Sequence, residues 1–275
     1  MLTLDQSLLK QVLKVAEKAG EAILEIYHQS EEVEIEKKDD NSPVTAADHA
    51  AHKVIVESLL AAYPDVPVFS EESGGIAFQD RQHWQEFWLV DPLDGTKEFI
   101  NRTGEFTVNI ALIQNGEPVL GVVTVPLKNT AYLGARGIGA YKVLDHEPWQ
   151  EIKVRDINWD QLIVVGSRRH GAEALDALIA KLSSRFSSIE TANMGSSLKF
   201  CLIAEGKADI YPRLAPTSEW DTAAAQAVLM EAGGIVLDIE FNPLQYNKGE
   251  SVLNPHFYAL GDIAVDWKDM VLTYE

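Results

Sequence analysis

Four acidic residues in three separate segments of the chain could together bind a metal ion. Asp91 and Asp94 lie in the run Asp-Pro-Leu-Asp-Gly-Thr at 91–96, Glu71 lies upstream, and Asp221 lies far downstream in Trp-Asp-Thr. No His or Cys accompanies them. Carboxylate oxygens are hard ligands that suit Mg²⁺ better than Zn²⁺ or copper. The residue types therefore predict a magnesium site, and phosphate chemistry is the reaction class that such a site serves.

Each acidic segment also has a purely structural interpretation. Asp-Pro and Asp-Gly are ordinary turn sequences, and Glu71 with Glu72 could be solvated loop charges. Asp221 could be the N-cap of a helix that runs from 222 to 231 and ends before Gly233. The joint occurrence of all these segments in one chain favours the metal site.

The elements that position the aspartates can be predicted from the residues around them. An apolar run at 87–90 predicts a buried strand, and Pro92 and Gly95 are expected to stop it in a tight turn. A carboxylate at the end of a strand points in a fixed direction. A structural role open to Thr96 is the N-cap of a short helix that begins at Lys97.

Upstream and downstream of this turn, the apolar periodicity predicts helices and then an antiparallel meander. Residues 8–27 show an amphipathic helical stripe, and a second helix is expected after Thr45, with Asp48 in a capping box. Residues 106–143 are expected to form short strands separated by turns. The glycine-rich run 134–139 is interpreted as a hairpin rather than a dinucleotide-binding loop.

The second half of the chain alternates strands and helices. Strands are expected at 162–165, 208–211 and 235–237, and helices at 172–182, 197–204 and 222–231. No linker divides the chain, and the best candidate for a boundary is 145–158. We therefore predict an α/β (α+β) protein with lobes at 1–150 and 151–275, arranged as a layered α/β/α/β/α sandwich with the acidic cluster where the lobes meet.

The charge of the chain limits the classes of partner. A formal net charge of −19 would repel polymeric nucleic acid, which binds to basic surfaces. A small phosphate ester would be repelled as well unless divalent cations neutralised the pocket. The composition thus favours a small phosphorylated substrate bound together with metal.

Cysteine usage and hydropathy predict the compartment. The single cysteine, Cys201, excludes an internal disulfide and is expected to be a packed thiol in an apolar helix. The N-terminal residues lack a signal-peptide pattern, and no apolar segment reaches the roughly 18 residues of a membrane span. We expect a cytoplasmic monomer, with peripheral association at the inner face of the inner membrane as an open alternative.

Taken together, the segments resemble the inositol monophosphatase superfamily. Its signatures are the Asp-Pro-Leu/Ile-Asp-Gly-Thr turn and a Trp-Asp helix start followed by Gly-Gly, and both are present. The resemblance also covers 40–48 and 69–73, so it spans most of the chain. Lys-Glu-Phe at 97–99 and the run 196–201, with Arg213 downstream, resemble the bisphosphate nucleotidase branch. The resemblance implies the layered fold shared with fructose bisphosphatases, together with a lithium-sensitive, Mg²⁺-dependent phosphatase activity.

The resemblance also implies a set of metal ligands. Glu71, Asp91 and the Leu93 carbonyl would hold one Mg²⁺. Asp91, Asp94 and Asp221 would hold a second, and a third ion could bind more weakly near Glu71. Asp221 would also lie beside the substrate. Two such ions can clamp the attacking and leaving oxygens of an in-line displacement.

Several further roles follow from the same resemblance. Thr96, with Glu71, would accept a proton from the attacking water, and the Gly95 and Thr96 amides would bind phosphate oxygens. Asp40 and Asp48 lie in a stretch that is close to the metals in the family. Capping is the favoured role of Asp48, and a place behind the ligands or at a third ion is the alternative for both aspartates.

The substrate is predicted from residues that match the nucleotidase branch. Ser196, Lys199 and Arg213 match positions that contact the nucleotide's second phosphate, and His170 resembles the residue beside the adenine. Lys199 and Arg213 could instead be surface charges. The favoured substrate is 3'-phosphoadenosine 5'-phosphate, giving AMP and phosphate, with 3'-phosphoadenylyl sulfate as a second substrate and a link to sulfate assimilation.

Three alternatives compete with this function. A related phosphatase acting on inositol phosphates or other sugar phosphates is the main alternative, and a non-catalytic protein-binding role is weaker because the ligand set is intact. An aspartyl-phosphate mechanism is disfavoured, because Pro92 and Leu93 separate two aspartates that the Asp-x-Asp pattern places closer together.

Overall fold

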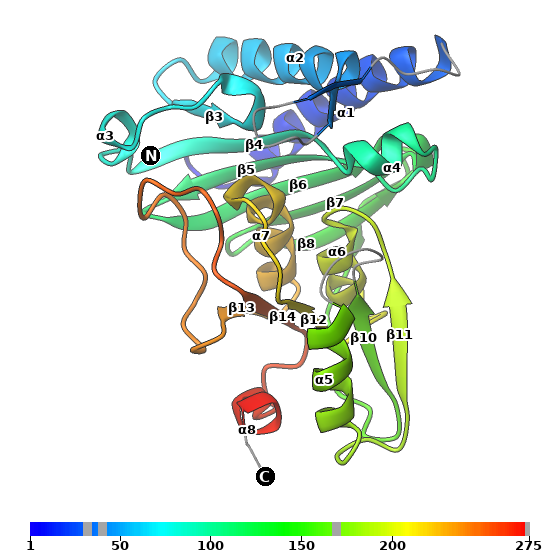
Figure 1. Ribbon diagram of the computed structural model, residues 1–275. Helices are drawn as coiled ribbons and strands as arrows, with labels where there is room; N and C mark the ends of the chain where they lie inside the picture. Colours follow the sequence, from blue (N-terminus) through cyan, green and yellow to red (C-terminus); the bar gives the residue numbers. More distant parts are fainter. Residues whose placement is uncertain (30–34, 38–42, 167–171, 273–275) are drawn as a thin grey trace.

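The structure is a computed structural model that describes residues 1–29, 35–37, 43–166 and 172–272, in which two β-sheets alternate with three layers of helices (Figure 1). The α-helices are α1 (Gln6–Gln29), α2 (Ala46–Ala62), α3 (Phe78–Arg81), α4 (Thr96–Ile100), α5 (Ala172–Leu182), α6 (Leu198–Ala204), α7 (Ala223–Glu231) and α8 (Trp267–Leu272). Short 3-10 helices are η1 (Glu71–Ser73), η2 (Pro126–Lys128) and η3 (Glu219–Asp221).

The strands fall into three sheets. They are β1 (Ile35–Lys37), β2 (Pro43–Thr45), β3 (Val68–Ser70), β4 (Glu86–Asp94), β5 (Thr107–Gln114), β6 (Glu117–Val125), β7 (Thr130–Ala135), β8 (Gly139–Leu144), β9 (Gln150–Glu151), β10 (Leu162–Gly166), β11 (Ile189–Asn193), β12 (Ile210–Arg213), β13 (Ile235–Asp238) and β14 (Phe257–Leu260). Strands β1 and β2 form an antiparallel pair, and the others build one seven-stranded and one five-stranded sheet.

The seven-stranded sheet runs in the order β3-β4-β5-β6-β7-β8-β9. Only β3 and β4 are parallel, and every later pair is antiparallel, which confirms the predicted meander. The run 134–139 joins β7 to β8 as the expected hairpin. Helices α1 and α2 cover one face of this sheet (Figure 1), and they bury apolar stripes that include Leu9, Ile23 and Ile55.

Helices α6 and α7 form the middle layer between the two sheets (Figure 1). Two glycines let α7 approach the seven-stranded sheet closely. A Cβ atom on Gly121 would lie 2.0 Å from the Ala224 carbonyl oxygen, and one on Gly134 would lie 2.6 Å from the Val228 Cα. Cys201 is a buried free thiol in α6, as predicted.

The five-stranded sheet has the order β11-β10-β12-β14-β13, with β10 parallel to both β11 and β12. Strand β14 runs antiparallel to β12 and β13. Helices α5 and α8 pack on the outer face of this sheet. The layers thus follow the order α/β/α/β/α, which confirms the predicted fold. Strands β11 and β14 and helix α8 were not predicted, because each is a short run without a clear period.

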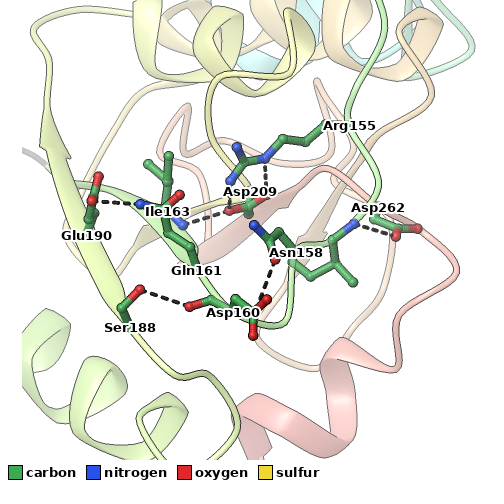
Figure 2. Close-up of polar contacts among 10 residues, drawn as sticks. Arg155, Asn158, Asp160, Gln161, Ile163, Ser188, Glu190, Asp209 and Asp262 are labelled. Carbon is green, nitrogen blue, oxygen red and sulfur yellow. Dashed lines mark hydrogen bonds and ion pairs between the residues drawn. The ribbon is translucent and has the colours of Figure 1, made fainter.

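The segment leading from β9 into the second sheet is held by two carboxylates, the buried Asp209 and the half-buried Asp262 (Figure 2). Asp209 accepts hydrogen bonds from Arg155 Nε at 2.8 Å and Nη2 at 2.7 Å, and also from the Ile163 amide at 2.6 Å. Asp262 accepts one from the Ile157 amide at 3.0 Å. This segment contains residues 152–158 of the proposed boundary at 145–158, and the division at residue 150 stays a prediction. Across the described ranges, no helix has the length and apolarity to cross a bilayer.

Candidate metal and phosphate site

Asp91 and Asp94 lie at an irregular end of β4. Asp91 pairs with Asn109 and Asp94 with Thr107, and the register shifts between the two pairs. The expectation that Pro92 stops the strand is therefore wrong. Proline cannot donate a ladder hydrogen bond, but the chain bulges at 92–93 and pairing resumes at Asp94. Asp91 is 2% exposed, and its Oδ1 accepts a hydrogen bond from the Leu93 amide at 3.0 Å.

Glu71 is brought beside Asp91 by strand pairing. Ser70 lies opposite Val90 in the parallel β3–β4 pair, so the next residue of each strand reaches the same end of the sheet. Glu71 opens η1, a turn closed by reciprocal hydrogen bonds between Ser70 and Ser73. The His52 Nδ1 lies 2.8 Å from the Ser70 Oγ, which gives the turn a second support from α2.

Asp221 is the last residue of η3, rather than the N-cap of α7. Its Oδ2 accepts a hydrogen bond from the Ser218 amide at 2.9 Å, which completes a capping box on the 3-10 turn. Helix α7 begins at Ala223, and the Thr222 side chain makes no cap hydrogen bond. The alternative interpretation of Asp221 as the N-cap of the 222–231 helix is therefore wrong, because the chain makes a separate turn before that helix starts.

The three segments meet in one carboxylate cluster. Glu71, Asp91 and Asp221 each place one oxygen so that all three lie within 4.8 Å of one another. Burial raises the pKa of Asp91 well above its ordinary range, and nearby carboxylates, Glu71 first among them, raise it further. Burial likewise raises the pKa of Asp221, with a further contribution from Asp94. Oxygen ligands whose charges repel fit a hard divalent cation such as Mg²⁺.

Asp94 lies outside this group of three but interacts with it. Burial raises the pKa of Asp94 to about 6, while Lys199 and a hydrogen bond from the Ser197 amide act in the opposite direction. Asp94 is half-buried. The structure therefore brings all four predicted acidic residues into one neighbourhood, with Asp94 on the side of Lys199.

Thr96 is the first residue of α4, and its interpretation as the cap of a helix from Lys97 is wrong. Gly95 takes the cap position with φ +91°, a conformation suited to glycine. The Thr96 hydroxyl donates a hydrogen bond to Asp48 Oδ1 at 3.2 Å. The other carboxylate oxygen of Asp48 accepts from the Thr45 amide at 2.8 Å, so the predicted capping box is confirmed. Asp48 thus completes the cap of α2 and also contacts Thr96. Asp40 lies outside the described residues.

Lys199 and Arg213 lie on the side of the site formed by α6 and β12. Lys199 is only 7% exposed, so its interpretation as a surface charge is wrong. Its Nζ donates to the Ser196 carbonyl at 2.6 Å and to the Met194 carbonyl at 3.3 Å. Burial lowers the pKa of Lys199 to about 8, and Asp94 partly offsets that effect. Arg213 donates through Nε to the Ala215 carbonyl at 3.0 Å.

Ser196 and His170 are the other two residues predicted to contact the substrate. Ser196 has a positive φ of 47°. Its Oγ is buried and has no hydrogen-bond partner among the described residues. A hydroxyl in this state can serve a bound ligand. His170 lies outside the described residues.

A buried hydrogen-bond network supports Asp94 and was not predicted. The Ser197 hydroxyl donates to Asn109 Oδ1 at 2.7 Å and lies 3.0 Å from the Thr107 hydroxyl. Asn109 Nδ2 donates to Thr107 Oγ1 at 3.1 Å. Thr107 and Asn109 are the strand partners of the two aspartates. The polar residues Thr107 and Asn109 in the otherwise apolar 107–113 strand are the sequence signal that could have predicted this network.

This chain, a five-layered sandwich with a carboxylate cluster at the end of β4, belongs to the inositol monophosphatase family. The family profile matches residues 4–267. Membership confirms the resemblance inferred from the sequence motifs.

Within the family, the chain is similar to 3'(2'),5'-bisphosphate nucleotidases named CysQ. It is 48% identical to CysQ of Salmonella typhimurium over 257 residues, which cover 91% of this chain and 98% of the relative. CysQ of Haemophilus influenzae is 40% identical over 273 residues, or 98% of each chain. The crystal structure of CysQ from Bacteroides thetaiotaomicron superposes with a TM-score of 0.82 at 44% identity, covering 93% of this chain and 97% of the other.

Proposed function

We propose that this protein is a Mg²⁺-dependent 3'(2'),5'-bisphosphate nucleotidase that hydrolyses 3'-phosphoadenosine 5'-phosphate to AMP and phosphate. A second substrate would be 3'-phosphoadenylyl sulfate, which would link the enzyme to sulfate assimilation. The observation that carries the proposal is the buried ammonium of Lys199 beside a carboxylate cluster. Burying a lysine is costly, and an anionic ligand would stabilise it. The relatives named CysQ support the same substrate class.

The cluster supplies the ligands for the cation. Glu71, Asp91 and Asp221 would hold Mg²⁺, with Asp94 and the Leu93 carbonyl completing a set for two ions or three. Bound Mg²⁺ supplies electrostatic stabilisation of the phosphoryl oxygens and lowers the pKa of bound water.

The residues around the cluster would orient the reactants. The Thr96 hydroxyl donates to Asp48, so it can take a proton from the attacking water while its own proton passes to the Asp48 carboxylate. Glu71 can share that role. The Gly95 and Thr96 amides, at the start of α4, would bind oxygens of the phosphate that is cleaved.

The remaining contacts would select the nucleotide. Lys199 and Arg213 would bind the phosphate that is not cleaved, and the Ser196 hydroxyl, which has no partner among the residues the structure describes, would donate to it. His170 would contact the adenine. We expect the enzyme to act in the cytoplasm as a monomer.

A phosphate-release panel with Mg²⁺ tests the proposal. The panel compares 3'-phosphoadenosine 5'-phosphate with inositol monophosphate and with a small monophosphate. Lys199→Ala should lower kcat/KM for the bisphosphate about ten- to a hundredfold, because a charge-assisted phosphate contact is lost. The small monophosphate should be hydrolysed nearly as before.

Two further variants make the comparison interpretable. Lys207→Ala removes an exposed lysine paired with Glu205 and should leave both substrates unchanged. Asp221→Asn should abolish release from both, because it removes a cation ligand. Equal losses on both substrates in Lys199→Ala, or a wild-type preference for inositol monophosphate, would reject the bisphosphate assignment. The second result would favour a phosphatase of inositol or other sugar phosphates.

A further inference from the structure

A buried arginine outside the site holds both flanks of the turn that carries Glu71. Arg81 is 1% exposed. Its guanidinium carbon lies 5.2 Å from the centre of the Phe69 ring, and Phe69 precedes Glu71 by two residues. Its Nε donates to the Ile76 carbonyl at 3.2 Å, just after the turn. Arg81 therefore fixes the chain on either side of this cation ligand.

The same guanidinium is connected to the turn that carries Asp221 by Asn247. Arg81 Nη1 donates to Asn247 Oδ1, and Asn247 Nδ2 donates back to the Arg81 carbonyl at 2.7 Å. The Asn247 amide donates to both oxygens of Glu219, at 2.9 and 3.0 Å. Glu219 is 4% exposed and opens the 3-10 turn that ends at Asp221.

Other contacts make this connection stiff. Arg81 Nη2 donates to the Gly249 and Glu250 carbonyls, each at 2.9 Å, which holds the loop after Asn247 in place. The Trp220 ring meets the Phe69 ring edge-on, with centroids 5.7 Å apart. The Arg81 guanidinium is fully buried and donates hydrogen bonds to four carbonyl groups. Its position is therefore fixed.

The connection through Arg81 and Asn247 joins the two turns whose carboxylates repel each other. Glu71 and Asp221 have oxygens within 4.8 Å and come from segments far apart in the chain. Without a cation between them, like charges push the two turns apart. A connection through Arg81 and Asn247 opposes that motion from outside the cluster.

We propose that Arg81 and Asn247 are positioning residues for the divalent-cation site. They hold Glu71 and Asp221 at a binding separation before the ion arrives, so the cation does not have to draw the two turns together. The inference rests on the proposed function only in requiring that the cluster binds a divalent cation. Groups that orient metal ligands typically change metal affinity or activity about ten- to a hundredfold when removed.

Direct titration of the purified protein with Mn²⁺, followed by electron paramagnetic resonance of the free ion, measures binding without turnover. Asn247→Gly is the key variant. It keeps the amide that binds Glu219 and suits the φ of 57°, but it removes both side-chain contacts with Arg81. We expect its Mn²⁺ dissociation constant to rise about tenfold or more. The Mg²⁺ concentration for half-maximal activity should rise by the same factor, with kcat at saturating Mg²⁺ nearly unchanged.

Two arginine variants and one control complete the test. Arg81→Met should weaken Mn²⁺ binding at least as much as Asn247→Gly, and Arg81→Lys should recover part of the loss because it restores the charge. Arg155→Met breaks another arginine clamp, on Asp209, away from the cluster. It should lower the melting temperature without changing Mn²⁺ affinity. If Arg81→Met does not fold, the Mn²⁺ affinity of Asn247→Gly alone tests the positioning role.

The outcomes separate this inference from the function on which it rests. Wild-type protein that binds no Mn²⁺ would overturn the cation site itself. Wild-type affinity in a folded Asn247→Gly variant would overturn only the positioning role. A weakening in Arg155→Met equal to that in Arg81→Met would also overturn it, since general destabilisation would then explain the loss.

Discussion

Replacing Asp94 by asparagine should stabilise the protein when no cation is bound. The pKa of Asp94 is raised from 3.8 to about 6 in the folded chain. Between these values the folded chain keeps a proton that the unfolded chain has lost, so the free energy of unfolding falls as pH rises. The loss is complete above about pH 6. Glu219, whose pKa burial raises to about 7, acts in the same direction.

The size of this effect can be worked out from the shift. A pKa change from 3.8 to about 6 corresponds to about 3 kcal/mol. Asp94 is half-buried, so solvent screening reduces the figure to about 2 kcal/mol. For a chain of this size, that amount moves the melting temperature by about 4–8 °C. Mg²⁺ at a hundredfold excess over its dissociation constant would raise the free energy of unfolding of the wild type by about 2.7 kcal/mol.

The assay is a set of melting curves with EDTA or Mg²⁺ at several pH values. With EDTA at about pH 7.5, Asp94→Asn should melt above the wild type, and the difference should vanish near pH 4. Mg²⁺ should narrow or reverse the gap, because the variant has lost a ligand. Asp65→Asn, at an exposed position, serves as the control. An Asp94→Asn variant that melts no higher than the wild type in EDTA at this pH would refute the reasoning.

Two further predictions concern the hydroxyl at the site and the packing of the middle layer. Thr96→Val should lower kcat about 10²- to 10⁴-fold at saturating Mg²⁺ while Thr96→Ser keeps most activity, and phosphate release that survives in the valine variant would exclude the hydroxyl from proton transfer. Gly121→Ala should cost about 1–3 kcal/mol or more in denaturant unfolding, because the new methyl would lie 2.0 Å from the Ala224 carbonyl oxygen. Gly249→Ala, whose methyl meets nothing within 4 Å, should be nearly neutral, and equal effects at the two glycines would contradict the close contact.

The long periodic parts of the fold could be predicted from the sequence, and the short parts could not. Helix α1 and the 106–143 meander repeat their apolar pattern over enough residues to identify the element and its buried face. Strand β14 has four residues and exists because β12 and β13 pair with it on both sides. The end of β4 was misjudged for a related reason. Pro92 is a local stop signal, but strand β5 offers pairing partners beyond it.

The candidate site shows a similar division. The acidic residues could be predicted because carboxylates are rare in apolar surroundings and their motifs resemble a known family. Lys199 could be placed near phosphate by resemblance, although its burial depends on how α6 packs. The contact between Arg81 and Asn247 spans 166 positions and joins residues of ordinary turn composition. No local pattern distinguishes such a pair from solvated polar residues.

The close packing of α7 against Gly121 and Gly134 also affects how the chain folds during translation. Strands β6 and β7 emerge from the ribosome roughly a hundred residues before α7, which at about 5–20 residues per second is a delay of roughly 5–20 seconds. Throughout that interval the face of the meander that carries Gly121 and Gly134 lacks α7, the helix that packs on these glycines in the folded chain. We therefore expect this apolar sheet face of the nascent chain to stay exposed until the segment that carries Asp221 and α7 has been made.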